Sequence, residues 1–127
     1  MADKNDIYLN YKGIDYEVVF TLNVMEQIQD EYGTIEKWGD LTEGTIKGKK
    51  KPDAEPNAKA VIFGLTCMIN EGIDIYNEDH EGEADFKPRK YLTKKQVGRL
   101  LTDVGITEAT SKLNKAVIDS TKSNEKN

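Results

Sequence analysis

Two short stretches of the chain carry side chains that could do chemistry. The first is a basic cluster made of Lys47, Lys49, Lys50 and Lys51. Clustered ammonium groups attract phosphate, so this cluster could contact a nucleic acid. No aromatic residue interleaves with these lysines to stack on bases, and the whole chain has a formal charge of −5. A solvated loop is therefore the favoured interpretation, and a nucleic-acid partner is not expected.

An acidic stretch further along the chain shares part of the pattern of a calcium loop. Oxygen-bearing side chains alternate and a glycine follows them, at Asn77, Asp79, Glu81 and Gly82. An EF-hand loop needs a bidentate glutamate at its twelfth position, and the twelfth residue counted from Asn77 is Pro88. We therefore expect no metal here.

The chain has one histidine, His80, and one cysteine, Cys67. A general base needs an ordered set of partners, whereas a position inside an acidic loop predicts an exposed His80. On a helix, Cys67 has Ala60, Phe63 and Gly64 as neighbours, and an apolar setting makes a thiol inert. A single cysteine also excludes an internal disulfide framework. Without any nucleotide-binding, nucleophile or zinc motif, we expect no catalytic residue, no cofactor and no enzyme.

A predicted β-hairpin that leads into a helix begins the chain. Apolar residues alternate on both sides of Lys12-Gly13, where glycine supplies the positive φ of a hairpin turn. Thr21 is placed to cap the following helix and Gly33 to end it. The buried face of the second strand should carry Ile14, Tyr16, Val18 and Phe20. The buried stripe of the helix should hold Leu22, Val24, Met25, Ile28 and Tyr32.

Further helices are expected along the rest of the chain. After Thr34 we expect a short turn, and then a hydrophobic helix that Asn57 caps and Gly72 ends. Thr93 and Thr107 are placed to cap two more helices, the first with a capping box. Residues 73–76 are expected to be extended, 43–56 and 77–90 to be long loops, and 1–6 and 120–127 to be disordered.

These elements predict the α+β fold class, with a mainly helical body of about four helices and an N-terminal β-hairpin. The length of 127 residues fits a single domain, 1–127. No apolar run approaches the length of a membrane span, and the N-terminus lacks the apolar segment of a signal peptide. We therefore expect a cytoplasmic protein without a membrane partner.

The helix over 57–72 is apolar on two sides. Its main stripe consists of Ala58, Val61, Ile62, Leu65, Met68 and Ile69. The opposite side carries Ala60, Phe63, Gly64 and Cys67. A helix of this kind is either central to a core or covers a partner. Core packing is the favoured interpretation, and these four residues are the candidate partner-binding surface.

The order of elements over residues 11–35 resembles that of the tail assembly chaperones of long-tailed phages and prophages of Gram-positive bacteria. Members of that family open with a hairpin that ends in Phe-Thr or a similar pair, here Phe20-Thr21. A helix with an acidic end and a Tyr-Gly stop follows, here Tyr32-Gly33. Residues 57–72 and 91–108 resemble later helices of the family.

The resemblance implies an α+β fold and a chaperone without catalytic residues. Proteins of this family bind the tape-measure protein while tail-tube subunits polymerise, and they are absent from the finished particle. The tail-tube protein is then a further candidate partner, and a homo-oligomer stays open. Two alternatives remain: a small structural head–tail joining or tail-completion protein, and a cytoplasmic regulator that binds nucleic acid through residues 47–51.

Overall fold

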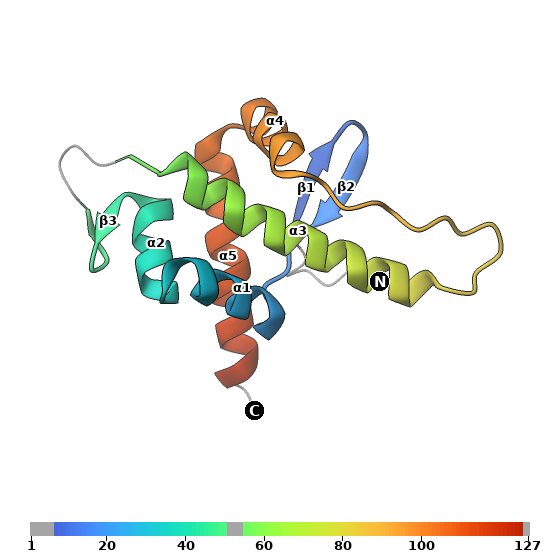
Figure 1. The fold of residues 1–127 in the computed structure, drawn as a ribbon, viewed down its shortest axis with the longest axis horizontal. Coiled ribbons are helices and arrows are strands. Elements are labelled where there is room, and N and C mark those ends of the chain that lie inside the picture. Colours follow the sequence, from blue (N-terminus) through green and yellow to red (C-terminus); the bar gives the residue numbers. More distant parts are fainter. Residues whose placement is uncertain (1–6, 51–54, 126–127) are drawn as a thin grey trace.

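Five helices and two short antiparallel hairpins make up the part of the chain that the structure describes. This computed structural model describes residues 7–50 and 55–125 (Figure 1). The predicted α+β class with an N-terminal hairpin is confirmed, with one more helix than expected. The elements are β1 (Tyr8–Tyr11), β2 (Ile14–Glu17), α1 (Leu22–Tyr32), α2 (Ile35–Glu43), β3 (Thr45–Ile46), β4 (Lys49–Lys50), α3 (Ala58–His80), α4 (Lys94–Val104) and α5 (Ile106–Glu125).

The N-terminal hairpin has the predicted turn. Lys12 and Gly13 both have positive φ, 53° and 84°, as a type I′ turn requires. Tyr11 therefore pairs with Ile14, and the antiparallel register continues to Tyr8 and Glu17. Of the face expected to be buried, Tyr16 and Val18 are buried, but Ile14 is 40% exposed. Ile14 follows the turn directly, at the tip of the hairpin.

Helix α1 begins at its predicted cap but turns a different face to the core. The Thr21 hydroxyl accepts a hydrogen bond from the backbone N–H of Val24 and donates one to Glu71 of α3. With its start held against α3, the helix buries Val24 and Ile28, while Leu22 is 75% exposed. The prediction that Leu22 belongs to the buried stripe was therefore wrong.

The segment after Thr34 is a full helix and not the short turn that was expected. The Thr34 hydroxyl accepts from the backbone N–H of Lys37, and α2 runs for nine residues with Trp38 buried. Beyond α2, the predicted loop 43–56 contains the small β3–β4 hairpin. Its turn, Lys47-Gly48, also has two positive φ angles. Residues 51–54 lie outside the described part of the chain.

Helix α3 continues well past Gly72, where the sequence analysis placed its end. It runs to His80, so residues 73–76 are helical and the following loop begins at residue 81 instead of 77. A Cβ atom at position 72 would lie 2.5 Å from the carbonyl oxygen of Glu17. Gly72 is therefore a point of close contact between α3 and β2, and not a helix stop.

All the other major elements pack around α3. Figure 1 shows α3 crossing the whole molecule, with α1 and α2 along one side, α4 on the other, and α5 crossing behind it. Strand β2 also contacts α3. The largest fully buried side chains are those of Trp38, Leu9, Ile28, Leu65, Met68, Ile69, Ile73, Leu100, Leu113, Val24, Val61 and Val97. Leu65, Met68 and Ile69 confirm the main predicted stripe of α3.

The last two helices begin near their predicted caps. Thr93 and Gln96 form the expected capping box at the start of α4, through reciprocal side-chain and backbone hydrogen bonds of 3.1 and 2.8 Å. Helix α5 begins at Ile106, one residue before the predicted cap, and extends to Glu125. Most of the predicted disordered segment 120–127 is thus helical. Residues 126–127 and the predicted disordered segment 1–6 lie outside the described part.

Two asparagines of α3 hold the extended chain that leads to α4. The Asn70 side chain donates to the carbonyl of Leu92 and accepts from its N–H, at 3.0 and 2.9 Å. Asn77 makes the same pair with Arg89, at 3.1 and 2.9 Å. Seven residues of helix rise about 10.5 Å and three extended residues span about 10 Å, so the two spacings match. The side-chain amides replace the strand partner that this segment lacks.

Replacing Asn70 by alanine should lower the free energy of unfolding by roughly 1–3 kcal/mol, because both polar groups of the Leu92 backbone lose their partner. Urea denaturation followed by circular dichroism measures the change. The matched control is Gln29→Ala on the exposed surface of α1, which should stay within about 0.5 kcal/mol of the wild type. If the two substitutions change the free energy of unfolding equally, the two hydrogen bonds between Asn70 and Leu92 do not stabilise the fold.

Candidate functional site

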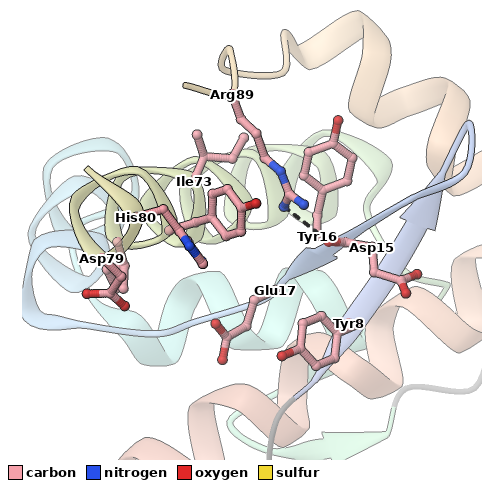
Figure 2. Close-up of a pocket in the computed structure, with 11 residues that line it drawn as sticks. Tyr8, Asp15, Tyr16, Glu17, Ile73, Asp79, His80 and Arg89 are labelled. Carbon is pink, nitrogen blue, oxygen red and sulfur yellow. Dashed lines mark hydrogen bonds between the residues drawn. The ribbon is translucent and has the colours of Figure 1, made fainter. Parts of the chain in front are cut away.

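A polar pocket of about 320 Å³ lies between the hairpin and the C-terminal half of α3 (Figure 2). Arg89 reaches across it, with its guanidinium 3.8 Å from the Tyr76 ring centroid and one N–H donating to the carbonyl of Asp15 at 3.4 Å. Figure 2 shows Glu17 and Tyr8 on the opposite wall. The Arg89 guanidinium is thus already bound by groups of the chain itself. Its contacts join the 81–93 segment to the hairpin.

His80 lies at the edge of this pocket, and it is the last residue of α3 instead of part of the predicted acidic loop. Its ring packs 4.2 Å from the Tyr76 ring and 5.8 Å from the Phe86 ring, measured between centroids. Its Nδ1 atom lies 3.0 Å from the Glu83 carboxylate. The side chain is 37% exposed, as an exposed position predicts, but it packs in a small aromatic cluster.

The acidic stretch that shares part of a calcium-loop pattern is divided between a helix and a loop. Asn77 and Asp79 are on α3, and the amide of Asn77 binds the backbone of Arg89. Glu81 and Gly82 follow the helix. Within residues 7–50 and 55–125, no three His, Cys, Asp or Glu side chains come close enough to hold a metal ion.

The lysine cluster lies on the β3–β4 hairpin, beside a carboxylate. Asp40 accepts hydrogen bonds from the Thr45 hydroxyl and from the backbone N–H groups of Lys47 and Gly48, at 2.7, 2.9 and 3.0 Å. These bonds, that of Thr45 first, hold the pKa of Asp40 below its ordinary value. A negative charge therefore sits against this turn, where a phosphate would have to bind. Lys51 lies outside the described part.

Half of the candidate partner-binding surface is covered by Trp38. The indole N–H donates to the carbonyl of Ala60 at 3.1 Å, and both residues are buried. A Cβ atom at Gly64 would overlap the indole ring. Ala60 and Gly64 are therefore part of the internal contact between α2 and α3, and a partner cannot reach them in this structure.

Phe63 lies instead at the edge of an open groove between α3 and α4. The ring is half-buried, packs edge-on against Tyr32 with centroids 5.6 Å apart, and has the Lys94 ammonium 5.2 Å from its centroid. The groove has a volume of about 490 Å³. We call it the α3–α4 groove, and its lining residues are Lys59, Ile62, Phe63, Lys94, Lys95 and Gly98.

Gly98 leaves the floor of the α3–α4 groove uncovered. It lies inside α4, where glycine is less favourable than alanine by about 1 kcal/mol. A Cβ atom there would be 3.7 Å from the nearest atom of Ile62, an ordinary contact. Packing therefore does not require glycine at position 98, in contrast to positions 64 and 72. Its effect is to leave Ile62 and Phe63 accessible from outside.

The groove continues into a second hollow of about 320 Å³, which shares Phe63 and Lys94 with it. Polar side chains also line this hollow: Tyr91 is 59% exposed and donates its hydroxyl proton to Asp74 at 2.7 Å. Cys67 lines the hollow and is itself buried, as predicted. Burial raises the pKa of the Cys67 thiol from 9.0 to about 11, against a smaller lowering by the Lys94 charge.

Cys67 should react slowly with thiol reagents. The thiolate is the reactive form, and a rise in pKa from 9.0 to about 11 lowers its fraction at pH 8 about a hundredfold. Iodoacetamide should therefore modify the folded protein at least about a hundred times more slowly than the protein unfolded in urea, and the rate should keep rising with pH up to about 11. Equal rates in the two states would contradict this.

The candidate surface predicted from the sequence lies on the helix that forms one side of this groove, but only some of its residues border the groove. Phe63 and Cys67 border the groove and its hollow, whereas Ala60 and Gly64 do not. Lys59, Lys94 and Lys95 escaped notice because isolated lysines at helix starts have no distinctive spacing. The one sequence feature that could have indicated the groove is Gly98, because this glycine lies inside a predicted helix where no turn requires it.

Comparisons with protein-family models, with curated proteins and with solved structures found no match for this chain. Over the residues that the structure describes, no helix has the length and apolar character that crossing a membrane would need.

Proposed function

We propose that this protein is a tail assembly chaperone of a long-tailed phage or prophage, which binds the tape-measure protein during tail assembly. The α3–α4 groove is the observation that supports it best. An apolar floor of Ile62 and Phe63 stays open between α3 and α4, and an open apolar groove of this kind suits a helix that lays its apolar face into it.

The order of elements supports the same proposal. A tight hairpin leads into a helix that a Tyr-Gly pair ends, and Gly33 has the positive φ, 91°, of a helix stop. The function requires protein contact and no chemistry, and the α3–α4 groove offers a contact surface of apolar side chains and lysines. We place the protein in the cytoplasm of the bacterial host and not in the finished particle.

Co-expression with the tape-measure protein of the same phage tests the proposal. Because a covered apolar helix no longer aggregates, we expect the tape-measure protein to stay in the supernatant after centrifugation when this chain is present, and to sediment without it. An unrelated acidic protein of similar size serves as the control. If the tape-measure protein sediments equally with and without this chain, the proposal fails.

Mass spectrometry of purified phage particles distinguishes the chaperone function from the alternative of a structural protein that stays in the particle. A chaperone should be present in the lysate of infected or induced cells and missing from particles purified by density gradient. Stoichiometric retention in the particles would instead favour a head–tail joining or tail-completion protein.

A further inference from the structure

Three lysines occupy positions where a positive charge disfavours folding. Lys59 is the second residue of α3, and Lys94 and Lys95 are the first two residues of α4. The first turn of a helix carries unpaired N–H groups and the positive end of the helix dipole, so that carboxylates are preferred there and ammonium groups are not. The capping box of α4 shows that this helix start is otherwise well formed. Helix stability therefore does not explain these lysines.

The same three lysines surround the apolar floor of the α3–α4 groove. They come from both helices, and the Lys94 ammonium lies over the Phe63 ring. Within the described part of the chain, none of the three forms an ion pair. The protein as a whole has a formal charge of −5, so the groove is a local region of opposite sign. Unpaired ammonium groups around an apolar surface attract a partner with carboxylates beside an apolar stripe.

We propose that the α3–α4 groove binds an amphipathic helix whose apolar stripe is flanked by aspartate or glutamate. The inference rests on the proposed function, in which that helix belongs to the tape-measure protein. Apolar side chains of the helix would contact Ile62 and Phe63, and its carboxylates would meet the three lysines and the N-terminus of α4. Gly98 provides the space for the helix.

The charge of the groove also limits where the carboxylates of the partner can lie. Glu71 and Asp74 line the adjoining hollow, so a carboxylate at that end would meet repulsion. Phe63 and Asp74 are eleven residues apart on α3, which is a rise of about 16 Å. The carboxylates of the bound helix are therefore confined to the end that lies beside the three lysines. About three helical turns further along, beside Glu71 and Asp74, its side chains should be neutral or basic.

Two labelled peptides of about five helical turns test the inference with the full chain. Both carry the same leucine stripe, and one has glutamates and the other lysines beside it at one end. In fluorescence anisotropy, the wild type should bind the acidic peptide more tightly, and added salt should reduce the difference. Lys94→Glu/Lys95→Glu should weaken binding of the acidic peptide by about tenfold or more and favour the basic peptide.

The matched control is Lys47→Glu/Lys49→Glu, which changes the net charge equally on a hairpin outside the groove. It should leave both affinities unchanged. The groove variant should unfold at an equal or higher urea concentration than the wild type, because it places carboxylates in the first turn of α4. A loss of binding together with a lower midpoint would mean disruption of the fold and would count against the proposal.

Gly98→Leu tests the shape of the groove independently of its charge. It should improve the helix propensity of α4 and place a side chain over Ile62, so that binding of both peptides is lost while the fold is kept. Equal binding of the two peptides by the wild type, or unchanged binding in Gly98→Leu, would overturn the proposal. The wild type could also self-associate through the groove. If Gly98→Leu abolishes that self-association and the acidic peptide does not compete with it, the groove binds a second copy of this chain, and the proposal is overturned as well.

The same variants separate this inference from the proposed function. If both variants still keep the tape-measure protein soluble, the chaperone function stands and the groove is not its site. If the wild type fails to keep it soluble but retains its preference for the acidic peptide, the proposed function is overturned and the specificity of the groove is supported.

Discussion

Replacing Trp38 by alanine should lower the free energy of unfolding by about 3–5 kcal/mol. The side chain is 1% exposed, it donates its N–H to the carbonyl of Ala60, and its ring fills the space that Gly64 leaves on α3. Removing it leaves a cavity between α2 and α3 that these two helices cannot close. Domains are usually stable by only about 5–15 kcal/mol, so the loss is a large fraction of the total.

Urea denaturation followed by circular dichroism measures this effect, since Trp38 is the only tryptophan and its fluorescence is lost with it. Trp38→Phe is the matched control. It keeps most of the ring volume but removes the N–H donor, so a smaller loss of roughly 1–2 kcal/mol is expected. A loss below about 1 kcal/mol in Trp38→Ala would mean that the contact between α2 and α3 does not depend on the indole.

Replacing Gly72 by alanine should also destabilise the protein, by about 1–3 kcal/mol. In most helix interiors the same substitution stabilises by about 1 kcal/mol. At position 72, however, the new Cβ atom would lie 2.5 Å from the carbonyl oxygen of Glu17. The oxygen belongs to the backbone of β2, so the hairpin itself must move away from α3.

Gly39→Ala is the matched control for Gly72→Ala. Gly39 also lies inside a helix, α2, but a Cβ atom there would have no neighbour within 4 Å. This substitution should raise the free energy of unfolding by up to about 1 kcal/mol. If the two alanine variants shift the urea midpoint in the same direction, the hairpin does not approach α3 as closely as the structure indicates.

Local features were predictable from the sequence because neighbouring residues supply their physical cause. The Lys12-Gly13 turn, the Thr21 cap and the Gly33 stop each depend on hydrogen bonds or φ angles within a few residues. The capping box at Thr93 is of the same kind. The buried Cys67 was also predictable, because apolar residues surround it on its own helix.

The errors arose where one residue type fits two situations. Gly72 could end a helix or allow a close contact, and the sequence analysis chose the first because no local pattern reveals the carbonyl of Glu17. For Gly64, core packing was the favoured interpretation and a partner surface the alternative; the ring that covers it belongs to a residue 26 positions earlier, Trp38, which no local pattern reveals. Asn77, taken as part of an acidic loop, is a helical residue that binds Arg89.

The candidate site was only partly predictable. The side of the helix that carries Phe63 and Cys67 could be found from its apolar character, but the groove exists only where α4 lies beside α3. Lys59 comes from one helix and Lys94 and Lys95 from the other, and no sequence spacing relates them.

By itself, the sequence determined the hairpin turn, the helix caps, the main stripe of α3 and the α+β class, because these depend on interactions between close neighbours in the chain. Only the tertiary structure decided which glycines are contact points and which apolar face stays open. Those outcomes depend on the atoms of distant segments: Trp38 closes one side of α3, Glu17 passes over Gly72, and Gly98 leaves the α3–α4 groove uncovered.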